Sequence, residues 1–127
     1  MKQRLSHESL IKGLIDYFQS KDLEISLANY SGFQKPFIIK RHSPDVLAID
    51  RSSGLVHIGI VKLCSSLTDQ TTKEEFEDFS KRLMKNANEK IRVPFYIAVP
   101  NDCQTKIQET FRRFEIPWKD NIHVLGF

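Results

Sequence analysis

A short apolar segment enclosed by two prolines is the feature that most constrains the fold of this chain. Residues 94–100 read Pro-Phe-Tyr-Ile-Ala-Val-Pro, and almost every side chain between the prolines is apolar. Successive side chains of a strand point to opposite faces of its sheet, so a strand of this kind is buried on both faces. We therefore expect a central sheet that helices cover on both sides.

Other stretches carry the spacing of amphipathic helices. The first spans residues 6–20, with Ser6 as its cap and with an apolar face made of Leu10, Ile11, Leu14, Ile15 and Phe18. The second begins at Thr71 or Thr72, ends near residue 90 and has an apolar face made of Phe76, Phe79, Leu83 and Ala87. The third begins at Asn101 or Asp102, ends near residue 114 and turns Ile107 and Phe111 inward.

Strand patterns fill most of the remaining chain. We expect strands at residues 23–30, 46–50, 55–63 and 122–125, and a loop or a short strand within residues 31–43. The order predicts an α/β fold with one mixed central sheet flanked by helices, in which the strands around the second helix run parallel. No linker or repeat interrupts this order, so residues 1–127 are expected to form a single domain.

Composition and charge exclude several classes of protein. Hydrophobic residues make up 40% and charged residues 28% of the chain, a balance that excludes a disordered chain or a coiled coil. The net charge of +3 is compatible with nucleic-acid binding but is too small to indicate it alone. No apolar run approaches the ~20 residues of a membrane span, so no membrane partner is expected.

The N-terminus and the cysteines favour a cytoplasmic location. The first residues lack the uninterrupted apolar stretch of a signal peptide. Cys64 and Cys103 have neither CxxC nor CxxH spacing, so we expect two reduced, unpaired thiols and no structural zinc site.

A tight connection at residues 51–54 predicts that the strands on either side of it form a hairpin. With a four-residue turn, the two positions of each facing pair have numbers that add to 105, which places Asp45 opposite Ile60. Alternation then puts Asp45 and Lys62 at the same end of one otherwise apolar face, close enough for long side chains to meet.

An acid and a lysine in this position allow two interpretations. One is a partly exposed ion pair worth about 0–1 kcal/mol on a plain α/β interaction domain. The other is a site of metal-assisted phosphodiester cleavage, where carboxylates bind Mg²⁺ or Mn²⁺ and the lysine orients water or steadies the phosphate. Glu8 lies on the inward side of the first helix and could add a second carboxylate, although a first-turn acid also favours the helix dipole.

The segment Ser43-Pro44-Asp45, the hairpin and Gly59-Ile60-Val61-Lys62 resemble the PD-(D/E)XK nuclease superfamily over residues 6–99. The resemblance implies a restriction-endonuclease-like αβββαβ core, here with an added αβ unit, and a metal-dependent nuclease that acts on DNA. It implies Asp45, Lys62 and Glu8 as catalytic residues, with Asp45 and Glu8 binding the metal.

The chain departs from this family at Ile60, because the family places an acid two residues before the lysine. A carboxylate from elsewhere could replace it, and the candidates are Asp50, Glu74, Glu75 and Asp78. We favour Glu75 as the additional metal ligand because it extends the inward stripe of Phe76 and Phe79, although residues 72–75 also form a capping box. Otherwise the chain is an inactive nuclease-like fold that serves as a nucleic-acid-binding or protein-interaction module.

The densest basic stretch of the chain contains Lys35, Lys40 and Arg41. We expect these residues to contact the nucleic-acid backbone, although a solvated loop has the same composition. One small domain often needs a second copy to embrace a duplex, so a homodimer is plausible. The histidines show no metal-binding spacing.

Overall fold

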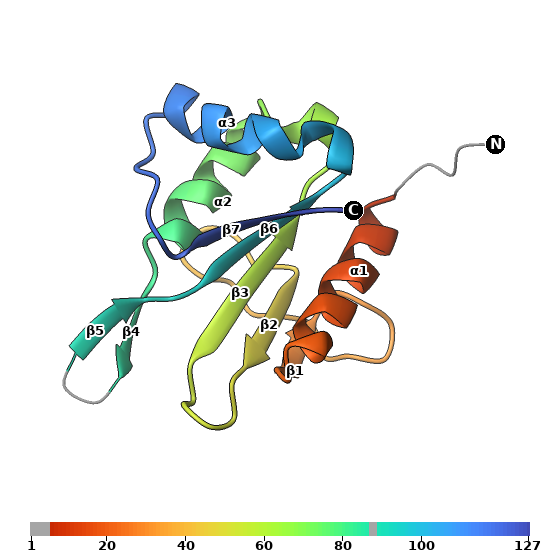
Figure 1. Ribbon diagram of the computed structural model, residues 1–127, viewed down its shortest axis with the longest axis vertical. Helices are drawn as coiled ribbons and strands as arrows, with labels where there is room; N and C mark the ends of the chain where they lie inside the picture. The colour runs from red at the N-terminus through yellow and green to blue at the C-terminus, as the bar shows by residue number, and fades with distance from the viewer. Residues whose placement is uncertain (1–5, 87–88) are drawn as a thin grey trace.

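A computed structural model describes residues 6–86 and 89–127 of the chain (Figure 1). In chain order the elements are α1 (His7–Ser20), β1 (Glu24–Ala28), β2 (Val46–Ile49), β3 (Val56–Val61), the 3-10 helix η1 (Cys64–Ser66), α2 (Gln70–Ser80), β4 (Leu83–Asn86), β5 (Glu89–Arg92), β6 (Phe95–Val99), the 3-10 helix η2 (Asn101–Lys106), α3 (Ile107–Arg113) and β7 (Ile122–Gly126). No helix in these two ranges is both long and apolar enough to cross a membrane.

The described strands form a five-stranded mixed sheet and a separate two-stranded sheet. The larger sheet has the order β1-β2-β3-β6-β7, and β4 pairs with β5. The pairs β1–β2 and β2–β3 are antiparallel, whereas β3–β6 and β6–β7 are parallel. The expected α/β class with a mixed central sheet is therefore confirmed, and the strands on either side of α2 run parallel as predicted.

Helices cover both faces of the large sheet (Figure 1). The buried apolar residues of α1 form one cluster with small side chains of the strands such as Ala48 and Ala98. Phe76 and Phe79 of α2 and Phe111 of α3 form the other cluster on the opposite face. The strand between the prolines contributes to both clusters, which explains why it is apolar throughout.

The second predicted helix ends ten residues earlier than expected, at Ser80. Leu83 is half exposed instead of lying on the buried face, and Ala87 lies outside the described residues. The chain turns after Ser80 because its carbonyl accepts hydrogen bonds from the side chains of Arg92 and Asn121, while Met84 packs against the core from strand β4. Strands β4 and β5 therefore form an antiparallel pair that the helical spacing did not reveal.

The expected capping box at residues 72–75 is also wrong. The cap of α2 is Asp69, whose side chain makes no capping hydrogen bond. The Thr72 hydroxyl donates to the carbonyl of Ser66 at 2.6 Å, and Glu75 turns toward the sheet.

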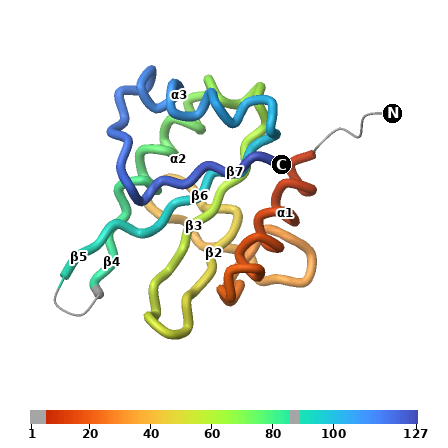
Figure 2. Tube along the Cα trace, viewed as in Figure 1, coloured from red at the N-terminus to blue at the C-terminus, as the bar shows by residue number. Residues whose placement is uncertain are grey.

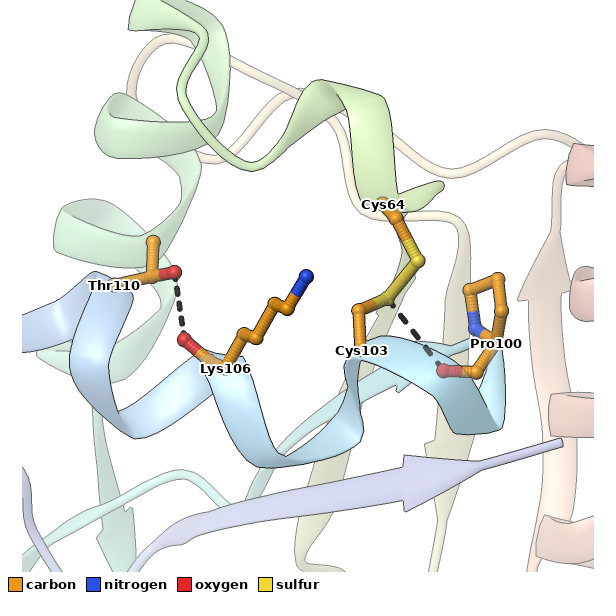
Figure 3. Close-up of a disulfide and its surroundings, with 5 residues drawn as sticks. All are labelled: Cys64, Pro100, Cys103, Lys106 and Thr110. Atoms are coloured by element: carbon orange, nitrogen blue, oxygen red, sulfur yellow. Dashed lines mark hydrogen bonds between the residues drawn. A yellow bond between two sulfur atoms is a disulfide. The ribbon is translucent and has the colours of Figure 1, made fainter.

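The expectation of two unpaired cysteines is wrong, because Cys64 and Cys103 form a disulfide (Figure 3). Cys64 begins η1, the next element after β3, and Cys103 lies in η2, the next element after β6. Since β3 and β6 are adjacent parallel strands, the segments that follow them emerge side by side, and the two Cα atoms are 5.8 Å apart. This pairing removes one of the two observations that favoured a cytoplasmic location.

Candidate functional site

The β2–β3 hairpin has the predicted register. Val46 faces Gly59 and Leu47 faces Ile58, so the positions pair as the four-residue turn requires. The register places Asp45 directly before β2, where its backbone N–H donates to the Gly59 carbonyl at 3.0 Å. Lys62 follows the last residue of β3, and its backbone N–H donates to the Ala98 carbonyl at 2.9 Å. Both residues therefore lie at the same end of the sheet.

The Asp45 carboxylate is nearly enclosed by protein, with 13% of its side chain exposed. Its Oδ2 accepts a hydrogen bond from the Val61 N–H at 2.8 Å, and its Oδ1 lies 4.0 Å from Nε2 of His7. Burial raises the pKa of Asp45, while the Val61 N–H and the nearby His7 and Lys62 act in the opposite direction. The Glu75 carboxylate also raises the pKa of Asp45, because two nearby negative charges repel each other.

Lys62 and Glu75 form an ion pair between the end of β3 and helix α2. Both side chains are largely buried, with exposed fractions of 14% for Lys62 and 9% for Glu75. The ammonium group of Lys62 contacts Oε1 of Glu75 directly, so each charge has its counter-charge beside it.

Ile60 occupies the position where the PD-(D/E)XK family has its second acid, and its side chain is fully buried in the core. Glu75 was the favoured replacement, and it is the candidate that the structure brings to Lys62. The other three candidates have partners elsewhere: Asp50 bonds with Ser52 at the hairpin turn, Glu74 with His42, and Asp78 with Arg41.

The structure does not bring Glu8 together with the other predicted metal ligands. Glu8 is exposed and lines a hollow of about 300 Å³ with residues of the 29–35 loop. Its neighbour His7, which the sequence did not single out, is the residue of α1 that approaches Asp45. Within residues 6–86 and 89–127, no group of three or more His, Cys, Asp and Glu side chains is arranged to hold a metal ion. Asp45 and Glu75 remain as a pair of carboxylates.

The predicted basic residues have different environments. Lys35 and Lys40 are exposed, and Lys40 adopts a left-handed backbone conformation with φ of 62°. Arg41 instead donates two hydrogen bonds to Asp78, at 3.0 and 2.7 Å, and lies within 4 Å of two further acids of α2, Glu74 and Glu77. The guanidinium holds the pKa of Asp78 below its usual value. Arg41 therefore ties its loop to α2, whereas neither Lys35 nor Lys40 forms an ion pair with an acid of the described residues.

Comparison of the chain with models of known protein families, with curated proteins and with solved structures finds no match. The function of the cluster formed by Asp45, Lys62 and Glu75 is therefore inferred from its geometry and chemistry.

Proposed function

We propose that this chain is a small metal-dependent nuclease of the PD-(D/E)XK type that hydrolyses DNA phosphodiesters. The observation that carries the proposal is that Lys62 and Glu75 form an ion pair at the end of the sheet where Asp45 lies, near enough for both charges to act on the pKa of Asp45. Asp45 directly precedes β2, Lys62 directly follows β3, and Glu75 lies on α2. The order of α1, β1, β2, β3, α2 and β6 supports it, because it is the αβββαβ order of that family with the β4–β5 hairpin inserted.

The pair of buried carboxylates fits a divalent cation. Burial and the charge of Glu75 both disfavour the ionised form of Asp45, and a bound cation would offset both effects. Carboxylate oxygens are the ligands that Mg²⁺ and Mn²⁺ prefer, and Mg²⁺ usually takes only one or two of them together with water and substrate phosphate. Asp45 and Glu75 would hold the metal, whose chemistry is to polarise the phosphate and acidify water.

Lys62 supplies the positive charge of the proposed site. Its position after the last residue of β3 fixes its backbone, and its ion pair with Glu75 holds the ammonium group inside the cluster. There it can donate a hydrogen bond to the scissile phosphate or to the attacking water. His7, half exposed and next to Asp45, lies where solvent reaches the cluster.

A second candidate is an inactive nuclease-like module that binds nucleic acid or a partner protein. It is favoured by Ile60, which fills the position of the family acid, and by the Lys62–Glu75 pair, which neutralises both charges. This module would bind no divalent cation at Asp45.

Titration with Mn²⁺ by calorimetry separates the two candidates. Asp45→Asn keeps an oxygen that can accept the Val61 hydrogen bond but removes the negative charge, so we expect Mn²⁺ binding to be lost while the fold is retained. Asp50→Asn, at the far end of the same strand, is the matched control and should bind as the wild type does. The same proteins are then tested for Mn²⁺-dependent cleavage of plasmid DNA.

Equal Mn²⁺ binding by the wild type and Asp45→Asn contradicts the proposed site. Absence of both Mn²⁺ binding and cleavage in the wild type supports the inactive module instead.

A further inference from the structure

The β4–β5 hairpin stands apart from the large sheet (Figure 1 and Figure 2). It extends away from the end of α2 and carries an unusual concentration of charge. Residues 81–92 contain five cations, Lys81, Arg82, Lys85, Lys90 and Arg92, and one acid, Glu89. Their net charge of +4 exceeds the +3 of the whole chain, so the remainder of the chain is slightly acidic. We call the strands β4 and β5, together with Lys81 and Arg82 before them, the basic hairpin.

The strand register places three of these cations, Lys85, Lys90 and Arg92, on one face of the basic hairpin. Lys85 pairs with Lys90 and Leu83 with Arg92, so these residues share a face. Met84 pairs with Ile91 on the other face, and Met84 packs against the core while its sulfur accepts the Val56 N–H at 3.4 Å. The face with Met84 therefore attaches the hairpin to the body. On the other face, Arg92 donates to the Ser80 carbonyl at the base of the hairpin, whereas Lys85 and Lys90, farther along the strands, are exposed.

Two lysines directly opposite each other destabilise an antiparallel pair, because their charges repel. Both Lys85 and Lys90 are exposed, and neither makes an ion pair with an acid in the described part of the chain. The register puts Glu89 on the face that carries Met84, so it does not relieve this repulsion. An external polyanion would relieve it.

We propose that the basic hairpin binds duplex nucleic acid, with Lys85 and Lys90 contacting backbone phosphates. This inference extends the proposed function by assigning the surface that holds the substrate. A two-stranded antiparallel hairpin has the width that the major groove of B-form DNA admits, and lysine contacts to phosphates give affinity without sequence preference.

The position of the hairpin suits a duplex that also reaches the candidate site. Glu75 lies five residues before the end of α2, which is about 8 Å along a helix axis, and the strands of the hairpin add about 13 Å. This sum is shorter than one turn of duplex, which is about 34 Å long. A membrane surface is a poorer partner, because Leu83 is the exposed large apolar residue of this hairpin and interfacial binding needs a broad apolar face.

The test is fluorescence anisotropy of a labelled DNA duplex, with EDTA present so that the metal site plays no part. Lys85→Ala/Lys90→Ala should weaken binding about tenfold and reduce the slope of log affinity against log salt by about 1.8. Lys106→Ala/Lys119→Ala removes the same charge from exposed positions outside the hairpin and should bind as the wild type does. Lys85→Arg/Lys90→Arg should retain binding.

Equal weakening by the two alanine variants overturns the inference, as does a wild type that binds no duplex. Binding to phosphatidylserine vesicles in place of DNA also overturns it and assigns the hairpin to membranes. Failure of the proposed function is recognised separately. If the chain binds DNA through Lys85 and Lys90 but cleaves no DNA, the inference about the hairpin stands and the proposed nuclease function fails. If cleavage needs Asp45 but neither lysine, the nuclease function stands and the inference about the hairpin fails.

Discussion

The ammonium group of Lys62 and the carboxylate of Glu75 form an ion pair that links the end of β3 to helix α2 in a largely buried environment. A buried pair of this kind has a large desolvation cost, which mutual attraction offsets only while both partners are present. The same pair is the core of the proposed site, so its contributions to folding and to function have to be separated.

Substitution of one partner should destabilise the protein more than substitution of both. Lys62→Met leaves the buried Glu75 without its counter-charge and should lower the free energy of unfolding by about 3 kcal/mol, and Glu75→Leu should do the same to Lys62. The double variant Lys62→Met/Glu75→Leu should recover most of that loss. Urea unfolding of the four proteins measures the coupling, and additive effects of the two substitutions would show that the pair is not formed.

Gly59 allows α1 to approach β3 closely. A Cβ atom added there would lie 2.6 Å from Cδ2 of Leu14 and 3.1 Å from Cε2 of Phe18, and both side chains are fully buried. Gly59→Ala should therefore destabilise the protein by about 1–3 kcal/mol, measured by denaturant unfolding. Leu14→Ala creates space at this contact, so the double variant should be more stable than the sum of the single effects predicts. Strict additivity would contradict the close contact.

His57 should make the fold sensitive to acid. Its ring packs beside those of Phe18 and Tyr96, with centroid distances of 6.5 and 5.8 Å, and burial lowers its pKa. The unfolded chain then binds the proton more readily than the folded chain does. The contribution of His57 to the free energy of unfolding is therefore fully present above the unfolded pKa of about 6.5. It is lost as the pH decreases through that value toward the lower folded pKa.

His57→Phe removes this titration and keeps an aromatic ring among the same neighbours. From about pH 7.5 to about pH 5.5 it should lose a few tenths of a kcal/mol less stability than the wild type, a small effect because His57 is half buried and partly screened by solvent. His123, whose pKa burial also lowers, still titrates in the variant. Parallel stability curves for the two proteins would contradict the assignment to His57.

The sequence predicts correctly those features that depend on residues close together in the chain. Alternating apolar residues and a four-residue turn set the register of β2 and β3, and this register alone brings Asp45 and Lys62 to one end of the sheet. The spacing from Glu75 to Phe76 and Phe79 likewise shows that Glu75 points inward.

The predictions that are wrong depend on contacts between segments that are distant in the sequence. Leu83 continues the helical spacing of Phe79, and only the bonds of the Ser80 carbonyl to Arg92 and Asn121 show that the helix stops there. The acids that bind Arg41 lie 33–37 residues away, on one face of α2. The sequence of the basic loop alone therefore does not show that these acids neutralise the charge of Arg41.

The disulfide should contribute substantially to stability. It closes a loop with a sequence separation of 39 residues, for which loss of chain entropy in the unfolded state corresponds to about 4 kcal/mol. Cys64→Ala/Cys103→Ala should therefore unfold at lower urea concentration than the wild type without a change of fold. Added dithiothreitol should lower the stability of the wild type toward that of the variant and leave the variant unaffected. Because the bridge fixes η1, which begins two residues after Lys62, the variant also reports on the site. Unchanged unfolding under reducing conditions would show that the bond is not formed in solution.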